Sequence, residues 1–111
     1  MIEETVIQYL TSQLDVPVYA EVPKKPLMRM VIVEKTGSSK TNHIKSATIA
    51  IQSYAETMYD ASILNEQVKE AMDDIIELDE VTSSRLQGDY NYTDTSTKHY
   101  RYQAVYALTH Y

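Results

Sequence analysis

Apolar residues along this chain follow two different spacings. In two segments they recur three or four positions apart, and in several others they occupy every second position. The first spacing is typical of a helix that buries one face, and the second of a strand that buries one side. The pattern predicts helices over 2–14 and 58–78, with strands between and after them.

The first helix is expected to end at Asp15, because the residue before Pro17 is pushed out of the α region. Its apolar positions are Ile2, Val6, Tyr9, Leu10 and Leu14. Residues 16–22 alternate, with Val16, Val18, Ala20 and Val22 on one side, and predict a strand. Pro17 puts this strand at an edge or start, since proline cannot donate to a ladder. A turn follows over 23–26.

Residues 27–35 predict a strand whose middle is apolar on both faces, as in strands covered from both sides. Residues 36–43 are small and polar and predict a mobile loop. Residues 44–55 alternate again and predict a half-polar strand.

The second helix carries the longest apolar stripe of the chain. Thr57 and Asp60 have the spacing of a capping box at its start. The stripe consists of Ala61, Leu64, Val68, Ala71, Met72, Ile75 and Leu78. Glu66, Glu70, Asp73 and Asp74 lie outside it, and such a charged face is typically solvated.

Residues 82–92 and 98–111 predict a hairpin with a polar tip at 94–97 and a bulge at Gly88. In the second arm Tyr100, Tyr102, Ala104, Tyr106 and Leu108 fall on one face. The order is helix, three strands, helix, two strands. It predicts a single α+β domain over 1–111 with a largely antiparallel or mixed sheet.

Composition removes several chemistries. The chain has no cysteine, which excludes disulfides, thiolate metal sites and a cysteine nucleophile. No apolar run is long enough to span a membrane, and the acidic start, Met-Ile-Glu-Glu-Thr, lacks the basic region of a secretory signal. We therefore expect a product that stays in the cytoplasm. A net charge of −6 argues against general nucleic-acid binding.

No motif predicts catalysis or a cofactor. His43, His99 and His110 lack the close spacing of zinc ligands, although spacing does not test a site built from distant residues. No Gly-x-Ser-x-Gly elbow occurs, and residues 36–41 lack the two-glycine frame of a phosphate-binding loop. We expect no cofactor, no metal and no enzymatic activity.

Ten tyrosines, without any Phe or Trp, leave a second hypothesis open. Sheets that display aromatic rings can stack single-stranded bases. Tyr90, Tyr92, Tyr100 and Tyr102, flanked by Lys98 and Arg101, predict a small surface of this kind. Tyrosine is also enriched at protein interfaces, which gives these residues a different use.

Four stretches together resemble a known family. They are Leu-Asp-Val-Pro-Val-Tyr-Ala-Glu-Val-Pro at 14–23, Met-Val-Ile-Val-Glu-Lys-Thr-Gly at 30–37, Ala-Ile-Gln-Ser-Tyr-Ala at 50–55, and the strand over 100–111. In this combination the chain resembles phage and prophage tail-terminator proteins, also described as minor tail, tail-completion or head-tail joining proteins. The resemblance covers nearly the whole chain.

The resemblance implies a mixed sheet with helices packed on one face. It implies a structural protein that forms a ring, a hexamer in the assembled tail, which caps the tail tube and presents the surface that joins the head. Expected partners are further copies of the chain, the tail tube protein and the head connector protein. Expected locations are the host bacterial cytoplasm during assembly and then the tail or neck of the virion.

A closed ring needs two different patches that meet between neighbours. The candidate interface residues are Lys40, Thr41, Asn42, His43, Tyr90, Tyr92 and Arg101. The loop over 36–43 is expected to become ordered on assembly. Glu66, Glu70, Asp73 and Asp74 are candidates for a channel lining that repels DNA phosphates. The alternatives are a head-completion or neck protein, and a small noncatalytic nucleic-acid-binding or regulatory domain.

Overall fold

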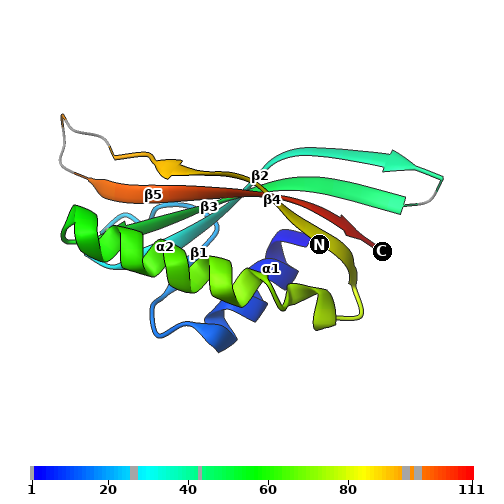
Figure 1. Ribbon diagram of the computed structural model, residues 1–111, viewed down its shortest axis with the longest axis horizontal. Coiled ribbons are helices and arrows are strands. Elements are labelled where there is room, and N and C mark those ends of the chain that lie inside the picture. The colour runs from blue at the N-terminus through cyan, green and yellow to red at the C-terminus, as the bar shows by residue number, and fades with distance from the viewer. Residues whose placement is uncertain (1, 26–27, 43, 94–95, 97–98) are drawn as a thin grey trace.

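The computed structural model describes residues 2–25, 28–42, 44–93, 96 and 99–111. Its helices and strands follow the predicted order along the chain, with a short 3₁₀ helix added after the second helix (Figure 1). They are α1 (Ile2–Gln13), β1 (Val18–Tyr19), β2 (Met30–Thr41), β3 (Ile44–Ala55), α2 (Met58–Met72), η1 (Ile75–Glu77), β4 (Val81–Asn91) and β5 (Tyr100–His110).

The strands form one five-stranded sheet in the order β1-β2-β3-β5-β4. β1 runs parallel to β2, and the other neighbours are antiparallel, so the sheet is mixed. β5 lies between β3 and β4 and pairs along its full length with β3. The chain is therefore an α+β fold with a mixed sheet, as predicted.

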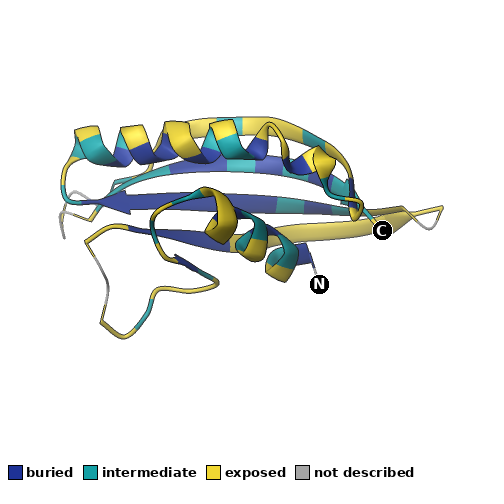
Figure 2. Ribbon diagram, turned by 90° about the horizontal axis from the view of Figure 1, so that it is seen from below, coloured by how far each residue is buried: buried dark blue, intermediate teal, exposed yellow. Residues whose placement is uncertain are grey.

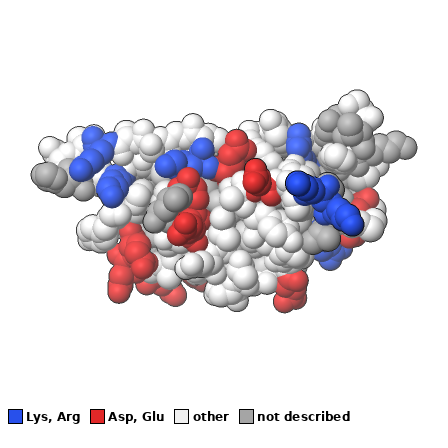
Figure 3. Space-filling view, turned by 180° about the vertical axis from the view of Figure 1, so that it is seen from behind, with Lys and Arg blue, Asp and Glu red and all other residues white. Residues whose placement is uncertain are grey.

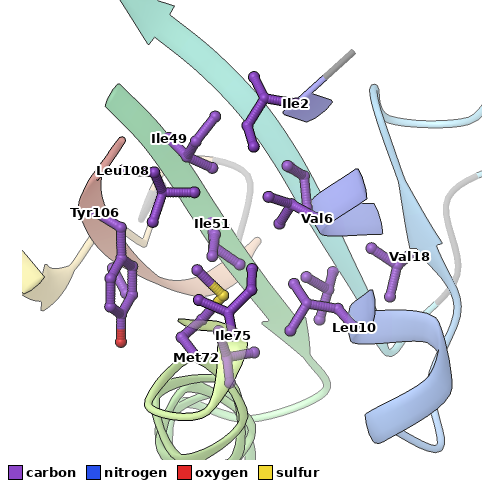
Figure 4. Close-up of a cluster of buried hydrophobic side chains, with 14 of the residues drawn as sticks. Ile2, Val6, Leu10, Val18, Ile49, Ile51, Met72, Ile75, Tyr106 and Leu108 are labelled. Carbon is purple, nitrogen blue, oxygen red and sulfur yellow. The ribbon is translucent and has the colours of Figure 1, made fainter. Parts of the chain in front are cut away.

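Both helices pack on the same face of the sheet (Figure 1). The second helix begins at Thr57, whose hydroxyl accepts a hydrogen bond from the backbone of Asp60 at 3.0 Å. Four of its buried residues, Ala61, Leu64, Val68 and Met72, belong to the predicted stripe, and the fifth is Asn65. Figure 4 shows Met72 beside side chains of α1 and the strands: Ile2, Val6 and Leu10 from α1, Ile49 and Ile51 from β3, and Tyr106 and Leu108 from β5.

A smaller cluster lies on the other face, where Met30, Ile32 and Tyr54 are buried and Tyr19 packs against them. Val31 and Val33 point to the helix side and belong to the main core. The strand predicted to be apolar on both faces is thus buried on both faces over Met30 to Val33, as expected from its sequence.

The prediction of a mobile loop over 36–43 is wrong for the residues that the structure describes. β2 continues to Thr41 and pairs in register with β3, with Ser38 opposite Ala47 and Lys40 opposite Lys45. Asn42 starts the turn with a φ of 51°, a left-handed conformation that Asn tolerates. The segment is polar because water reaches both of its faces, and polarity indicated exposure here rather than irregular backbone. His43 lies outside the described residues.

Two element boundaries also differ from prediction. The strand expected over 16–22 is reduced to Val18 and Tyr19; Val16 is only packed against the core, and Val22 is exposed. The second helix ends at Met72 rather than at residue 78, because Asp73 and Asp74 bring negative charge to the end where the helix dipole disfavours it. Ile75 still reaches the core through η1.

The final hairpin has the predicted strands, and the register shifts between Leu86 and Gly88, where a bulge was expected. Of its predicted tip, residues 94, 95 and 97 lie outside the described residues. The predicted alternation of β5 is confirmed: Ala104, Tyr106 and Leu108 are buried in the main core, while Tyr100 and Tyr102, at the start of the strand, are half-buried.

The molecule is elongated, with extents of 44 × 25 × 24 Å. At one end, the β2–β3 hairpin extends beyond the helices, and its β2 half is exposed throughout (Figure 2). We call this end of the hairpin, residues 36–42 and 44–48, the arm; its β3 half also pairs with the end of β5, and Ala47 is buried. Figure 1 shows the end of β4 and the start of β5 at the opposite end.

Candidate interaction surfaces

The sheet face opposite the helices carries a row of buried amides. Gln52, Gln103 and Tyr90 are neighbours across β3, β5 and β4. The Gln52 amide nitrogen donates to the Gln103 side-chain oxygen at 2.9 Å, and the Gln103 nitrogen donates to the Tyr90 hydroxyl. Tyr54 donates to the Gln52 oxygen at 3.3 Å. These bonds satisfy side chains that would otherwise be costly to bury.

A second row lies beside it, where Arg101 sits between two tyrosines. Its guanidinium carbon is 4.6 Å from the centre of the Tyr92 ring and 5.6 Å from that of Tyr54. The guanidinium also donates to the Tyr54 hydroxyl at 2.7 Å and to the Tyr92 carbonyl at 2.8 Å. Arg101 is therefore a fixed part of this face, held by stacking and hydrogen bonds together.

The structure divides the tyrosines that were predicted to form one stacking surface. Tyr90 and Tyr92 lie edge to face, with ring centres 6.0 Å apart, on the side away from the helices. Tyr100 and Tyr102 lie on the same side of β5 as Ala104, which belongs to the core beneath the helices, so both point to the helix side. The prediction of a joint surface of four rings is wrong, because alternation along β5 separates them. Lys98 lies outside the described residues.

Of the candidate interface residues, Lys40, Thr41 and Asn42 form the end of the arm. Tyr90, Tyr92 and Arg101 lie together on the β4–β5 hairpin, toward the other end (Figure 1). The two groups were predicted as one set of interface residues, but they are far apart in the structure. They form two separate surfaces of different composition.

The helix side of the arm borders a groove with a volume of about 450 Å³. We call it the arm groove; apolar atoms of Ile2 and Ala47 and the side chains of Lys35, Lys40, Lys45 and His110 line it. Sequence reasoning singled out Lys40 alone. The other two lysines join it because residues 35, 38 and 40 face residues 49, 47 and 45 across the ladder, a relation hidden while 36–43 was interpreted as a loop.

The acidic candidates lie on the outer side of α2 and just beyond it. Glu66, Glu70, Asp73 and Asp74 are all exposed. Glu66 forms an ion pair with Lys69 at 2.8 Å, and the others make no ion pair with a described residue. Figure 3 shows Lys and Arg at the end of the molecule with the arm and again at the opposite end, with Asp and Glu between and below them.

One charged contact was not predicted. Asp89 on β4 accepts hydrogen bonds from Lys69 and from the buried amide of Asn65, the latter at 2.7 Å. Burial acts to raise the pKa of Asp89, but the hydrogen bonds from Lys69 and Asn65 outweigh it and hold the pKa below its usual value. The hydrogen bond to Asp89 is the main cause of the raised pKa of Lys69. Nearby, burial raises the pKa of Tyr106 to about 12.

Replacing Asp89 by asparagine is expected to lower the free energy of unfolding by about 1 kcal/mol at pH 7, less than a fully buried hydrogen bond to a charged group contributes, because water reaches the Asp89 carboxylate and weakens its contacts. Since the pKa is depressed by folding, this contribution is present above the unfolded pKa and is lost as the pH falls through the folded pKa. Urea denaturation of both proteins at pH 7 and near pH 3 measures it. The difference should shrink at the lower pH, whereas Asp15→Asn, at an exposed carboxylate, should cost little at either. A pH-independent difference would mean that Asp89 acts without its charge.

Within the described residues no group of three His, Asp or Glu side chains could hold a metal ion. Nor does any helix in that part of the chain have the length and apolar character needed to cross a membrane.

No family model matches the chain, and no curated protein matches it closely enough to count as a relative.

Proposed function

We propose that this chain is a noncatalytic structural protein of phage tail assembly, of the tail-terminator type, that acts as a ring of identical copies. The observation that carries the proposal is the arm, the part of the β2–β3 hairpin that extends beyond the helices, where β2 is exposed throughout and forms an open edge of the sheet. An open edge presents unpaired backbone groups, so a covering partner would stabilise it. The residue patterns that resemble tail terminators give the class of assembly.

The surfaces of the chain differ in composition, which suits a ring. A closed ring uses heterologous contacts, in which each copy gives one patch and receives another. The arm carries lysines, and the sheet face away from the helices carries Tyr90, Tyr92 and Arg101 on β4, β5 and the residue after β4. Tyr and Arg are enriched in interfaces, and the fixed position of Arg101 lowers the entropy lost on binding.

The acidic side of α2 would have a separate role. Glu66, Glu70, Asp73 and Asp74 leave this surface strongly negative. Facing the channel of the ring, it would repel DNA phosphates and let the genome pass without adhering. The tail tube protein and the head connector protein would contact the two rims of the ring.

Light scattering coupled to size exclusion tests the proposal directly. By mass action, the average mass should rise toward that of a hexamer over a concentration range of about two orders of magnitude. Negative-stain micrographs of the same sample should show rings. A protein that stays monomeric throughout, or that stops at a closed dimer, would contradict a ring-forming function.

The alternatives give different results. A head-completion or neck protein would copurify with the portal side of the connector and not with the tail tube. A nucleic-acid-binding domain would shift single-stranded DNA or RNA with a strong dependence on salt. That alternative is weakened by the separation of Tyr100 and Tyr102 from Tyr90 and Tyr92.

A further inference from the structure

The arm places two lysines directly opposite each other. Lys40 and Lys45 are cross-strand partners, and Lys45 is in turn paired with His110 on β5. Like charges directly opposite one another destabilise a pair of strands. Neither lysine forms an ion pair with a described residue, whereas Lys35 lies 3.7 Å from Glu3. The arm therefore carries a repulsion that an anionic partner would relieve.

The arm groove is not purely ionic. Ile2 and Ala47 contribute apolar surface, and the lysines lie along the groove with them. Three lysines and one carboxylate, that of Glu3, give this groove a positive charge in a chain whose net charge is −6. Its best occupant would combine an apolar side chain with carboxylates on either side.

One segment of the same chain has this composition. In η1 and the turn after it, Ile75 is buried and holds the segment to the core, while Ile76 is 54% exposed. Glu77, Asp79 and Glu80 follow Ile76 closely in the sequence, are exposed, and form no ion pair with a described residue. We call residues 75–80 the acidic turn. An exposed isoleucine followed by three exposed carboxylates matches a groove with apolar surface and lysines.

We propose that the arm groove of one copy binds the acidic turn of a second copy, with Ile76 in the groove and the carboxylates at Lys40 and Lys45. This inference rests on the proposed function, because it names the contact that closes the ring. In Figure 1 the arm and η1 lie at the same end but at different levels, the arm with the sheet and η1 with the helices. The arm groove of one copy could therefore bind the acidic turn of one neighbour, while its own acidic turn binds the arm groove of the other, as a heterologous contact requires.

Charge exchange tests the contact. One variant, Lys40→Glu with Lys45→Glu, reverses the charge of the arm. A second, Glu77→Lys with Asp79→Lys, reverses the charge of the acidic turn. Each alone should associate more weakly than the wild type by about tenfold or more, since like charges then meet across the contact. An equimolar mixture should assemble again, because each arm then finds a turn of opposite charge on the other variant. Sedimentation velocity measures all of these species.

A matched control carries the same charge change elsewhere. Lys24→Glu with Lys25→Glu alters two exposed lysines outside the arm and should leave assembly unchanged. Ile76→Ser should weaken assembly without lowering thermal stability, whereas Ile63→Ser, at an exposed isoleucine on α2, should leave assembly unaffected. Circular dichroism of every variant confirms that it is folded.

The outcomes separate the two proposals. If wild-type protein is monomeric, the ring and the contact both fail. If it assembles and the two charge variants assemble equally well, only the contact is wrong. Failure of the mixture to recover would also overturn it. So would duplex DNA binding that depends on Lys40 and Lys45 while assembly does not, because phosphate would then be the anion that the arm takes.

Discussion

Replacing Ile51 by alanine is expected to lower the free energy of unfolding by about 3 kcal/mol, within the usual range for removing a large side chain from a packed core. Ile51 is completely buried in the middle of β3 and lies between the two helices and the sheet (Figure 4). Its removal leaves a cavity that rigid strands on both sides cannot close. Chemical denaturation monitored by circular dichroism measures the loss.

The control is the same substitution at Ile63, which is 42% exposed on α2. Ile63→Ala should change stability by less than about 0.5 kcal/mol, since alanine also has the higher helix propensity. Comparable losses at both positions would show that Ile51 is not at the centre of the core.

Replacing Gln103 by leucine should cost about 2 kcal/mol, because it leaves the buried amide of Gln52 without an acceptor. Replacing both glutamines by leucine should recover most of this loss, since two apolar side chains of similar shape need no partner. The Tyr90 hydroxyl loses its donor in both proteins, but Tyr90 is exposed and water can replace it.

A double-mutant cycle with Gln52→Leu, Gln103→Leu and the double variant measures the coupling between the two amides. Strictly additive losses would contradict a direct hydrogen bond across β3 and β5. The cycle also tests the sheet order, because only a sheet with these strands adjacent brings the two amides together.

The elements that could be predicted are those with a clear period. The stripe from Ala61 to Ile75 predicted which face of α2 is buried, and alternation from Tyr100 to Leu108 predicted which residues share a face of β5. In both, burial of one side imposes the period directly on the sequence. The β2 half of the arm, residues 36–42, has no buried side, so it carries no such period and could not be told from a loop.

The candidate surfaces were predictable only as separate parts. Tyr90, Tyr92 and Arg101 were chosen for their chemistry, and the structure does place them together. The partners Gln52 and Tyr54 were missed because they come from β3, and nothing local in the sequence indicates that β3 lies beside β5. The contact of Lys69 with Asp89 was missed for the same reason, since α2 and β4 are distant in the chain. The pair of Lys40 with Lys45 was missed because residues 36–43 were predicted as a loop.

The shortness of β1 has a consequence for how copies can stack. It pairs only with Val31 and Ile32, so in the described part of the chain the outer edge of β2 is open from Val33 onward. Long, flat, open edges invite endless strand addition and fibre growth. Here the register shifts between Lys35 and Gly37, and Lys35 and Lys40 carry charge along the same edge. An irregular, charged edge of this kind favours an assembly that stops at a defined size over one that grows without limit.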